Sequence, residues 1–157
     1  MDDSDGLLEL NNSAVVEDLD IEQRRILSRE EATALLQDLL ARTARKEALN
    51  LVAIADSRIV AYAMVMRRKG FSSHVGEFGI GITKGYRGIG IGTAMLQELI
   101  TSSRELGLKI LIAKTFASNI GMRQVLERSG FREVGHIPRT YERRGRYIDE
   151  IVSALEL

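Results

Sequence analysis

The sequence predicts a single α/β domain with a mixed, mostly antiparallel central sheet flanked by helices. Three observations predict this fold class. Strand-type runs joined by short turns fill the first half, helices alternate with short strands in the second half, and no Pro-, Gly- or Ser-rich stretch separates two units. A chain of 157 residues with 45% hydrophobic content can bury one core. The predicted domain therefore spans 1–157, with residues 1–16 as a loose terminus or a weak edge strand.

The first half begins with helical signals. Ser28 and Glu31 match a capping box, and leucines then recur at helical spacing, which predicts a helix over about 29–45. A shorter helix is expected over 17–27. Runs rich in apolar and β-branched residues follow, and they predict an antiparallel meander. Its strands are expected at 51–55, 59–66 and about 75–82, with a tight hairpin turn at 56–58 and a polar tip over 67–73.

The second half alternates helix and strand. Apolar residues at helical spacing follow a glycine-rich segment, and Gly107 ends that helix. Asn119 stands where an N-cap belongs and Gly130 where a terminating glycine belongs, so they frame a second helix over 120–129. The remaining strands are expected at 109–114, 131–136 and 147–155.

Charge and composition narrow the range of functions. Twenty-two basic residues balance twenty-two acidic ones, so the chain has no net field that would draw it to nucleic acid or to an anionic membrane. With no cysteine and two histidines, neither a disulfide framework nor a metal site is expected. The acidic N-terminus is unlike a signal peptide, and no apolar run reaches the ~18 residues of a membrane span. We therefore expect a cytoplasmic protein.

Glycines concentrate in one segment. Seven of the fourteen, at positions 76, 79, 81, 85, 88, 90 and 92, fall within seventeen residues. A glycine-rich turn between a strand and a helix exposes consecutive N–H groups and aims them, with the positive end of the helix dipole, at one point. That point favours an anion such as a pyrophosphate.

Two familiar phosphate-binding motifs do not match this turn. A P-loop needs Gly-Lys-Ser/Thr, whereas Gly92 is followed by Thr93 and Ala94. A dinucleotide fingerprint needs a third glycine three residues after Gly90, and Thr93 stands there. Taken alone, the segment is better explained as a turn that packs a helix close to a sheet than as a phosphate site.

The wider sequence resembles the GNAT superfamily of N-acetyltransferases. Arg87, Gly90 and Gly92 fill the core pattern of the first family motif, Gln/Arg-x-x-Gly-x-Gly/Ala. A second motif, a helix that starts at Asn and ends in Gly-Phe, is similar to residues 119–131. The two motifs occur in the family's order, and the resemblance extends from about Val52 to the C-terminus.

This resemblance implies a GNAT-like acyl-CoA-binding fold, with acetyl-CoA as the acyl donor. Backbone amides of the turn would hold the pyrophosphate, and main-chain groups around Ile82 and Thr83 would pair with the pantetheine arm. Asn119 would approach the same arm or serve only as a helix cap. The implied coenzyme-binding residues are Ile82, Thr83, Arg87, Gly88, Ile89, Gly90, Ile91, Gly92, Thr93 and Asn119.

The catalytic groups are less well defined. Leu126 stands where many family members carry the tyrosine that protonates the leaving thiolate, and leucine cannot donate a proton. Water could serve instead, or another tyrosine could reach the site. Tyr141 and Tyr147, near the C-terminal hairpin, are the candidate donors, although each is otherwise a packing residue.

Direct transfer also requires a base, because only a neutral amine has the lone pair that attacks the thioester. Glu77 is the candidate, since family members often use a carboxylate on this strand; a cross-strand or solvated charge is the alternative. Asp149 and Glu150 on the last strand could recognise a cationic amine, or they could simply form a charged strand face.

The implied function is acetyl-CoA-dependent transfer of an acetyl group directly to a primary amine of a protein, a peptide or a small molecule. The alternative is a non-catalytic acyl-CoA-binding sensor module, which Leu126 makes worth testing. Acetyl-CoA binding without thiol release would favour the sensor. Exposed edges of such sheets often pair, so a homodimer is a further expectation.

Overall fold

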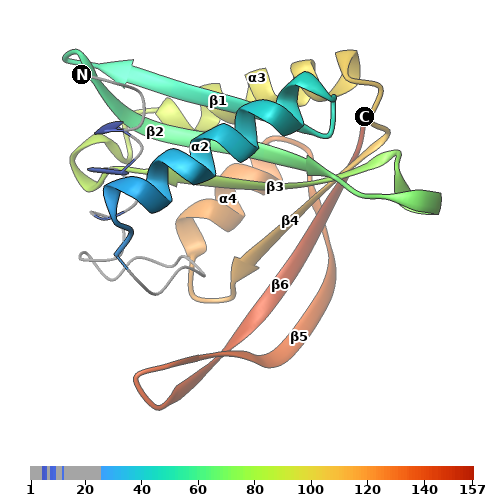
Figure 1. The fold of residues 1–157 in the computed structure, drawn as a ribbon. Coiled ribbons are helices and arrows are strands. Elements are labelled where there is room, and N and C mark those ends of the chain that lie inside the picture. Colours follow the sequence, from blue (N-terminus) through green and yellow to red (C-terminus); the bar gives the residue numbers. More distant parts are fainter. Residues whose placement is uncertain (1–4, 7, 10–11, 13–25) are drawn as a thin grey trace.

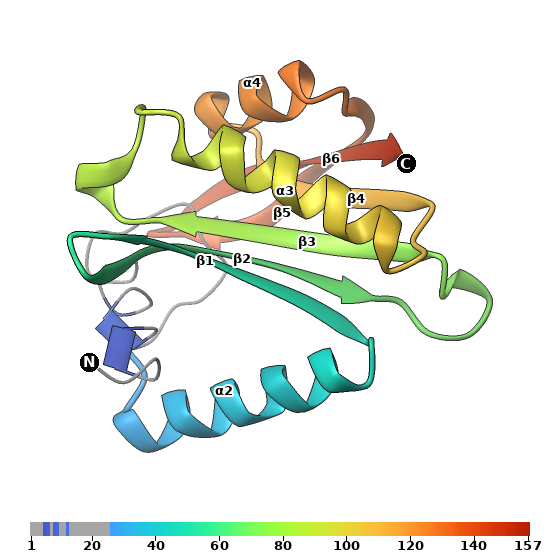
Figure 2. The ribbon, with the colours of Figure 1, turned by 90° about the horizontal axis from the view of Figure 1, so that it is seen from above.

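The computed structural model describes residues 5–6, 8–9, 12 and 26–157. A six-stranded sheet with the order β1-β2-β3-β4-β6-β5 has α2 on one face and α3 and α4 on the other (Figures 1 and 2). This arrangement confirms the predicted fold class. The helices are α2 (Arg29–Ala44), α3 (Ile91–Glu105) and α4 (Ile120–Arg128), and the strands are β1 (Ala48–Ala55), β2 (Arg58–Arg67), β3 (Val75–Ile82), β4 (Ile110–Phe116), β5 (Arg132–Arg143) and β6 (Arg146–Glu156).

The N-terminal predictions fall mostly outside the described residues. The short helix expected over 17–27 lies there, except for Ile26 and Leu27, which are not helical. The described positions among the first sixteen, 5–6, 8–9 and 12, are helical, so they do not form the weak edge strand that we considered as an alternative.

Helix α2 starts at the predicted capping box. The Ser28 hydroxyl accepts from the Glu31 backbone N–H at 3.2 Å, and the Glu31 carboxylate accepts from the Ser28 N–H at 2.9 Å. A polar relay joins the helix to the sheet: the Tyr62 hydroxyl donates to Asn50 at 2.6 Å, and the Asn50 side-chain amide donates to the Thr43 hydroxyl at 2.7 Å. Burial raises the pKa of Tyr62 to about 12, so the phenol stays a donor in this relay at neutral pH.

The first three strands form the predicted antiparallel meander. Asp56 and Ser57 turn the chain between β1 and β2 with φ values of 50° and 59°. Short polar residues tolerate this left-handed conformation, which gives a tight hairpin. Strand β3 has the predicted bounds, Val75–Ile82.

Strands β3 and β4 are parallel and stay together over only four residue pairs, from Val75 with Ile110 to Phe78 with Ala113. Beyond Phe78, β3 continues to Ile82 paired only with β2. Beyond Ala113, β4 continues to Phe116 paired only with β6. The two central strands therefore diverge. We call the gap in their pairing, between β3 beyond Phe78 and β4 beyond Ala113, the opening.

The main core lies between the sheet and α3. Leu96 and Leu99 of α3 are fully buried against the sheet, in one cluster with Val65 and Leu111. Gly76 permits the close contact here, because a Cβ at this position would lie 2.5 Å from Cγ1 of Val65. Gly107, with φ of 82°, terminates the helix as predicted.

The closing hairpin corrects one prediction. We expected its first strand to end at His136, before Pro138, but β5 runs to Arg143. Between Ile137 and Tyr141 three residues of β5 oppose one of β6, and Arg139 takes φ of 57°. The proline is accommodated because it lies in this bulge on an edge strand, where its missing N–H costs no ladder bond.

Candidate active site

A glycine turn follows β3 and leads into α3. A 3-10 turn, η2 (Lys84–Tyr86), follows Thr83, and Gly88 and Gly90 then adopt φ values of 74° and 95°. These left-handed values disfavour any other residue type. A Cβ at either glycine would have no atom within 4 Å, so the space above the turn is open.

The first turn of α3 has no side-chain cap. Gly90 is the N-cap residue, and the bond from the Ala94 N–H to the Gly90 carbonyl at 3.0 Å is the first of the helix. The N–H groups of Ile91, Gly92 and Thr93 therefore have no helical carbonyl to bind. Open N–H groups at the positive end of a helix dipole form a site for a phosphate group.

The strand edge beside this turn carries a second set of main-chain groups. The Thr83 N–H donates to the Val60 carbonyl at 2.9 Å, so odd-numbered residues of β3 bond to β2. The N–H groups of Ile80 and Ile82 consequently point toward β4, past the end of the β3–β4 pairing. The Ile82 carbonyl accepts from Arg87 Nε at 2.8 Å, which ties the turn to the strand. We expected main-chain groups of Ile82 and Thr83 to pair with the coenzyme arm. The Thr83 N–H and the Ile82 carbonyl are instead engaged within the protein.

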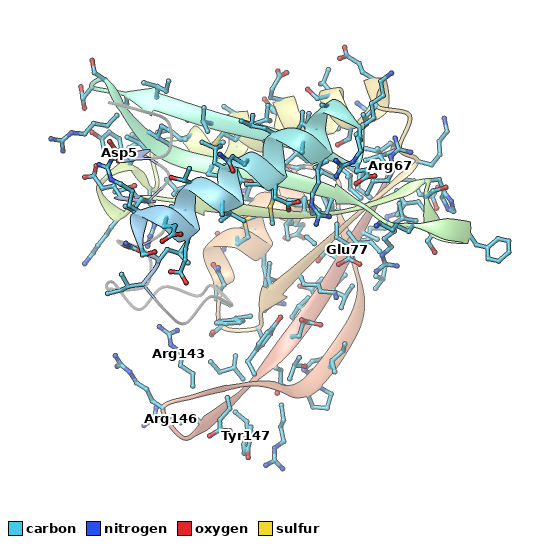
Figure 3. All side chains as sticks on the ribbon, viewed as in Figure 1. Asp5, Arg67, Glu77, Arg143, Arg146 and Tyr147 are labelled. Atoms are coloured by element: carbon cyan, nitrogen blue, oxygen red, sulfur yellow. The ribbon has the colours of Figure 1, made fainter. Side chains whose placement is uncertain are left out.

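The α2 face of the sheet gathers charged groups near the point where β3 and β4 diverge. Glu77 of β3 is half-buried, forms an ion pair with Arg68, and lies with Oε2 3.6 Å from Nζ of Lys114 on β4 (Figure 3 labels Glu77). Both carboxylate oxygens are therefore engaged by cations. Lys114 carries no local signal of this contact in the sequence, because it comes from a strand more than thirty residues away.

A buried carboxylate lies on the same face. Glu150 of β6 is 5% exposed, and its carboxylate accepts a hydrogen bond from the Tyr141 hydroxyl. The Tyr141 ring packs on Phe116 with centroids 4.5 Å apart. Phe116 is the register partner of Glu150 and shares its face with Lys114 two residues earlier. The structure therefore brings Glu77, Lys114, Tyr141 and Glu150 to one face of the sheet.

Tyr147 lies elsewhere. Strand alternation along β6 puts it on the face opposite to Glu150. It lies near the far end of the β5–β6 hairpin, 55% exposed, with the Arg139 guanidinium 4.1 Å from its ring centroid (Figure 3). The structure thus does not bring Tyr147 together with Glu77.

Asp149 shares the Tyr147 face. It accepts from the Arg139 backbone N–H at 2.8 Å and contacts Nε2 of His136 at 2.7 Å. These two hydrogen bonds, first that from Arg139 and then that from His136, lower the pKa of Asp149. Asp149 is therefore a local anchor of the β5 bulge, and its neighbour Glu150 is the carboxylate on the α2 face.

Asn119 and Leu126 belong to α4. The Asn119 side-chain oxygen accepts from the Met122 N–H at 3.1 Å, so the predicted cap is present. Leu126 is 1% exposed and packs in the main core. At this family position the chain therefore has a core residue and no proton donor.

The described residues contain neither a metal-binding cluster nor a membrane-spanning helix. No group of three His, Asp or Glu side chains there could hold a metal ion. No helix in the same part of the chain is long and apolar enough to cross a membrane.

An uncapped, glycine-started helix lies beside two diverging parallel strands, which is where the sequence resemblance places an acyl-CoA. The comparisons with known proteins agree. Residues 13–131 match the model of the Acetyltransferase (GNAT) family, and the chain belongs to this family. It is an acetyltransferase by family, which confirms the resemblance and the class of enzyme expected from the sequence.

Individual relatives include both solved structures and a curated sequence. The ribosomal-protein-alanine N-acetyltransferase from Brucella melitensis has a TM-score of 0.88 at 29% identity, covering 99% of this chain and 94% of that one. A phosphinothricin acetyltransferase from Sinorhizobium meliloti, solved in complex with AcCoA, shares the fold with a TM-score of 0.88 at 20% identity, covering 99% and 83%. The candidate phosphinothricin acetyltransferase YwnH of Bacillus subtilis (strain 168) is 33% identical over 81 residues. That match spans 52% of this chain and 50% of the relative.

Proposed function

We propose that this protein transfers the acetyl group of acetyl-CoA directly to a primary amine, and that its acceptor presents an α-amine. The observation that carries the proposal is the open N-terminus of α3 at the end of the strand that borders the opening. The opening adjoins the α2 face, so the reactive end of a donor held there would meet the face that carries Glu77 and Tyr141.

The residues fit the donor in two places. The N–H groups of Ile91, Gly92 and Thr93 would hold the pyrophosphate, and those of Ile80 and Ile82 would pair with the amides of the arm. Acetyl-CoA supplies an activated acetyl thioester. Holding it beside the acceptor makes the transfer effectively unimolecular.

Glu77 is the proposed base, and its surroundings bear on the choice of acceptor. It would take the proton from the amine directly or through water. Arg68 and Lys114 already contact the carboxylate oxygens of Glu77. An acceptor amine that is already neutral when it binds depends less on Glu77 for removal of its proton. At pH 7 an α-amine with a pKa near 7.8 is neutral in about one molecule in seven, whereas a lysine amine is neutral in about one in 2,500. An α-amine therefore suits this site better than a lysine side chain.

Tyr141 is the proposed proton donor for the leaving thiolate: its one hydroxyl proton, donated to Glu150 in this structure, would pass to the thiolate, and a proton from solvent would then restore the phenol. Its bond to Glu150 and its contact with Phe116 fix its position on the same face as Glu77. Tyr147 does not share that face, so it drops from the proposal. The Brucella relative is named for alanine, whose N-terminal amine is an α-amine, which supports the same class of acceptor.

The acceptor class is tested by mass spectrometry and thiol release with acetyl-CoA. The panel contains peptides with a free N-terminus, the same peptides blocked at the N-terminus but carrying lysine, free amino acids, polyamines and aminoglycosides. We expect acetylation at α-amines and little on the blocked peptides. Preferential lysine acetylation would overturn the α-amine assignment, and tight acetyl-CoA binding without any transfer would favour the sensor alternative.

The base is tested with Glu77→Gln. We expect kcat to fall by about 10²- to 10⁴-fold, because the amide cannot accept the proton, while the Kd for acetyl-CoA stays unchanged. Glu133→Gln is the matched control, since Glu133 is also a strand glutamate paired with an arginine, Arg123, at 2.8 Å. An equal loss of kcat in both variants would contradict the role of Glu77.

A further inference from the structure

We propose that the Thr115 hydroxyl is a positioning contact for the acyl-CoA arm, which it hydrogen-bonds where β3 and β4 diverge. The inference rests on the proposed function. Its starting point is that Thr115 is 8% exposed and that its Oγ1 is buried without a hydrogen-bond partner in the protein. A threonine hydroxyl can both donate and accept, so it could bind either the N–H or the C=O of an amide.

The position of Thr115 along β4 places it beside the opening. The pairing of β4 with β3 ends at Ala113, two residues earlier, while the pairing with β6 continues to Phe116. Leu111 and Ala113 point into the core beneath α3, and alternation puts Thr115 on that same face. Its side chain therefore lies on the α3 face. Thr115 is the first residue of β4 on that face that has no β3 neighbour.

The free-energy cost of burying a hydroxyl without a partner explains why Thr115 indicates a ligand. A buried hydroxyl without a partner loses its hydration and gains nothing in return, whereas valine would fill nearly the same volume without that cost. The N–H groups of Ile80 and Ile82 approach the opening from the opposite strand. A ligand arm with amide groups, lying between the two strands, would satisfy Thr115 as well as these N–H groups.

Ser103 provides a built-in comparison. Among the Ser and Thr hydroxyls of the described residues, it is the other buried one without a partner, at 0% exposure. It lies near the C-terminal end of α3, where its carbonyl accepts from the Leu108 N–H at 3.0 Å, at the opposite end of the helix from the glycine turn. Both hydroxyls are buried without a partner, but Thr115 lies beside the opening, whereas Ser103 lies near the far end of α3.

The experiment measures melting temperature without ligand and the Kd for acetyl-CoA by calorimetry in Thr115→Val and Ser103→Ala. Removal of an unpartnered hydroxyl should raise the Tm of both variants by about 2–4 °C. Thr115→Val should weaken acetyl-CoA binding by about 3- to 10-fold, as expected for one neutral hydrogen bond. Ser103→Ala should leave the Kd unchanged, and Thr115→Ser, which keeps the hydroxyl, should bind within about twofold of wild type.

The outcomes separate this inference from the function on which it rests. If wild-type protein fails to bind acetyl-CoA, the proposed function and this contact both fail. If wild type binds and Thr115→Val binds equally well, only the contact is overturned. An equal loss of affinity in Ser103→Ala would also overturn it, because the effect would then be one of packing.

Discussion

The two helices that follow the diverging strands begin in opposite ways. Helix α3, after β3, starts at Gly90, which has no side chain and a φ of 95°. Helix α4, after β4, starts at Asn119, whose side chain accepts from the Met122 N–H. Both termini concentrate unpaired N–H groups and the positive end of a dipole, but α4 binds part of this set with its own side chain. A helix that lacks a side-chain cap therefore leaves its N-terminal N–H groups available to a ligand.

The strongest test of this comparison is Gly90→Val. A β-branched residue is strained at this φ, and its side chain would fill the open space above the turn. We expect acetyl-CoA affinity to fall by about 100-fold or more, measured by calorimetry. Gly121→Ala, in the first turn of α4, is the control, because this glycine has an ordinary φ and open surroundings. Wild-type affinity in Gly90→Val would place the phosphate elsewhere.

A smaller effect is expected for Gly90→Asn. Asparagine tolerates the left-handed conformation, so this variant fills the space above the turn with little backbone strain. Affinity for acetyl-CoA should fall by about 10-fold, between wild type and Gly90→Val, while the Tm without ligand stays close to that of wild type. Unchanged affinity would mean that glycine is needed only for its φ and that the open space has no role.

The smallest effect is expected for Asn119→Ala. Loss of the cap should lower the free energy of unfolding by about 1 kcal/mol, measured by urea denaturation. Ser28→Ala removes a cap of the same kind from α2 and should cost a similar amount. Because the family resemblance also implies a contact between Asn119 and the coenzyme arm, its variant alone should bind acetyl-CoA about threefold more weakly. Equal affinity in the two variants would reduce Asn119 to a helix cap.

The proposed coenzyme-binding part of the site, the glycine turn and the start of α4, was largely predictable because its signals are local. Positive φ at Gly88 and Gly90, the cap at Asn119 and the helix stop at Gly107 each depend on a few consecutive residues. The bounds of β3 followed from an apolar run between turns. The strand β5 was cut short in the prediction because Pro138 indicates a strand end, and only pairing with β6 shows that a bulge accommodates it.

The proposed acceptor side of the site was less predictable because its residues come from four strands: Glu77, Lys114, Tyr141 and Glu150. Glu77 was a candidate by resemblance and Tyr141 by its place near the C-terminal hairpin, but their partners Lys114 and Glu150 carry no local signal of a shared face. Tyr147 was as good a candidate as Tyr141 in the sequence. Register and strand alternation in the folded hairpin separate the two tyrosines.

The order of the described elements, the glycine turn and the caps follow from local sequence, because backbone preferences and helix ends act over a few residues. Tertiary structure alone decided where β3 and β4 part, since the pairing of two strands depends on contacts more than thirty residues apart along the chain. The same long-range pairing brings Lys114 to one oxygen of Glu77, while the folded sheet buries Glu150 and leaves the hydroxyl of Thr115 without a partner beside the opening. The turn therefore marks the proposed coenzyme site in the sequence, and the divergence of the strands determines which side chains lie beside that site.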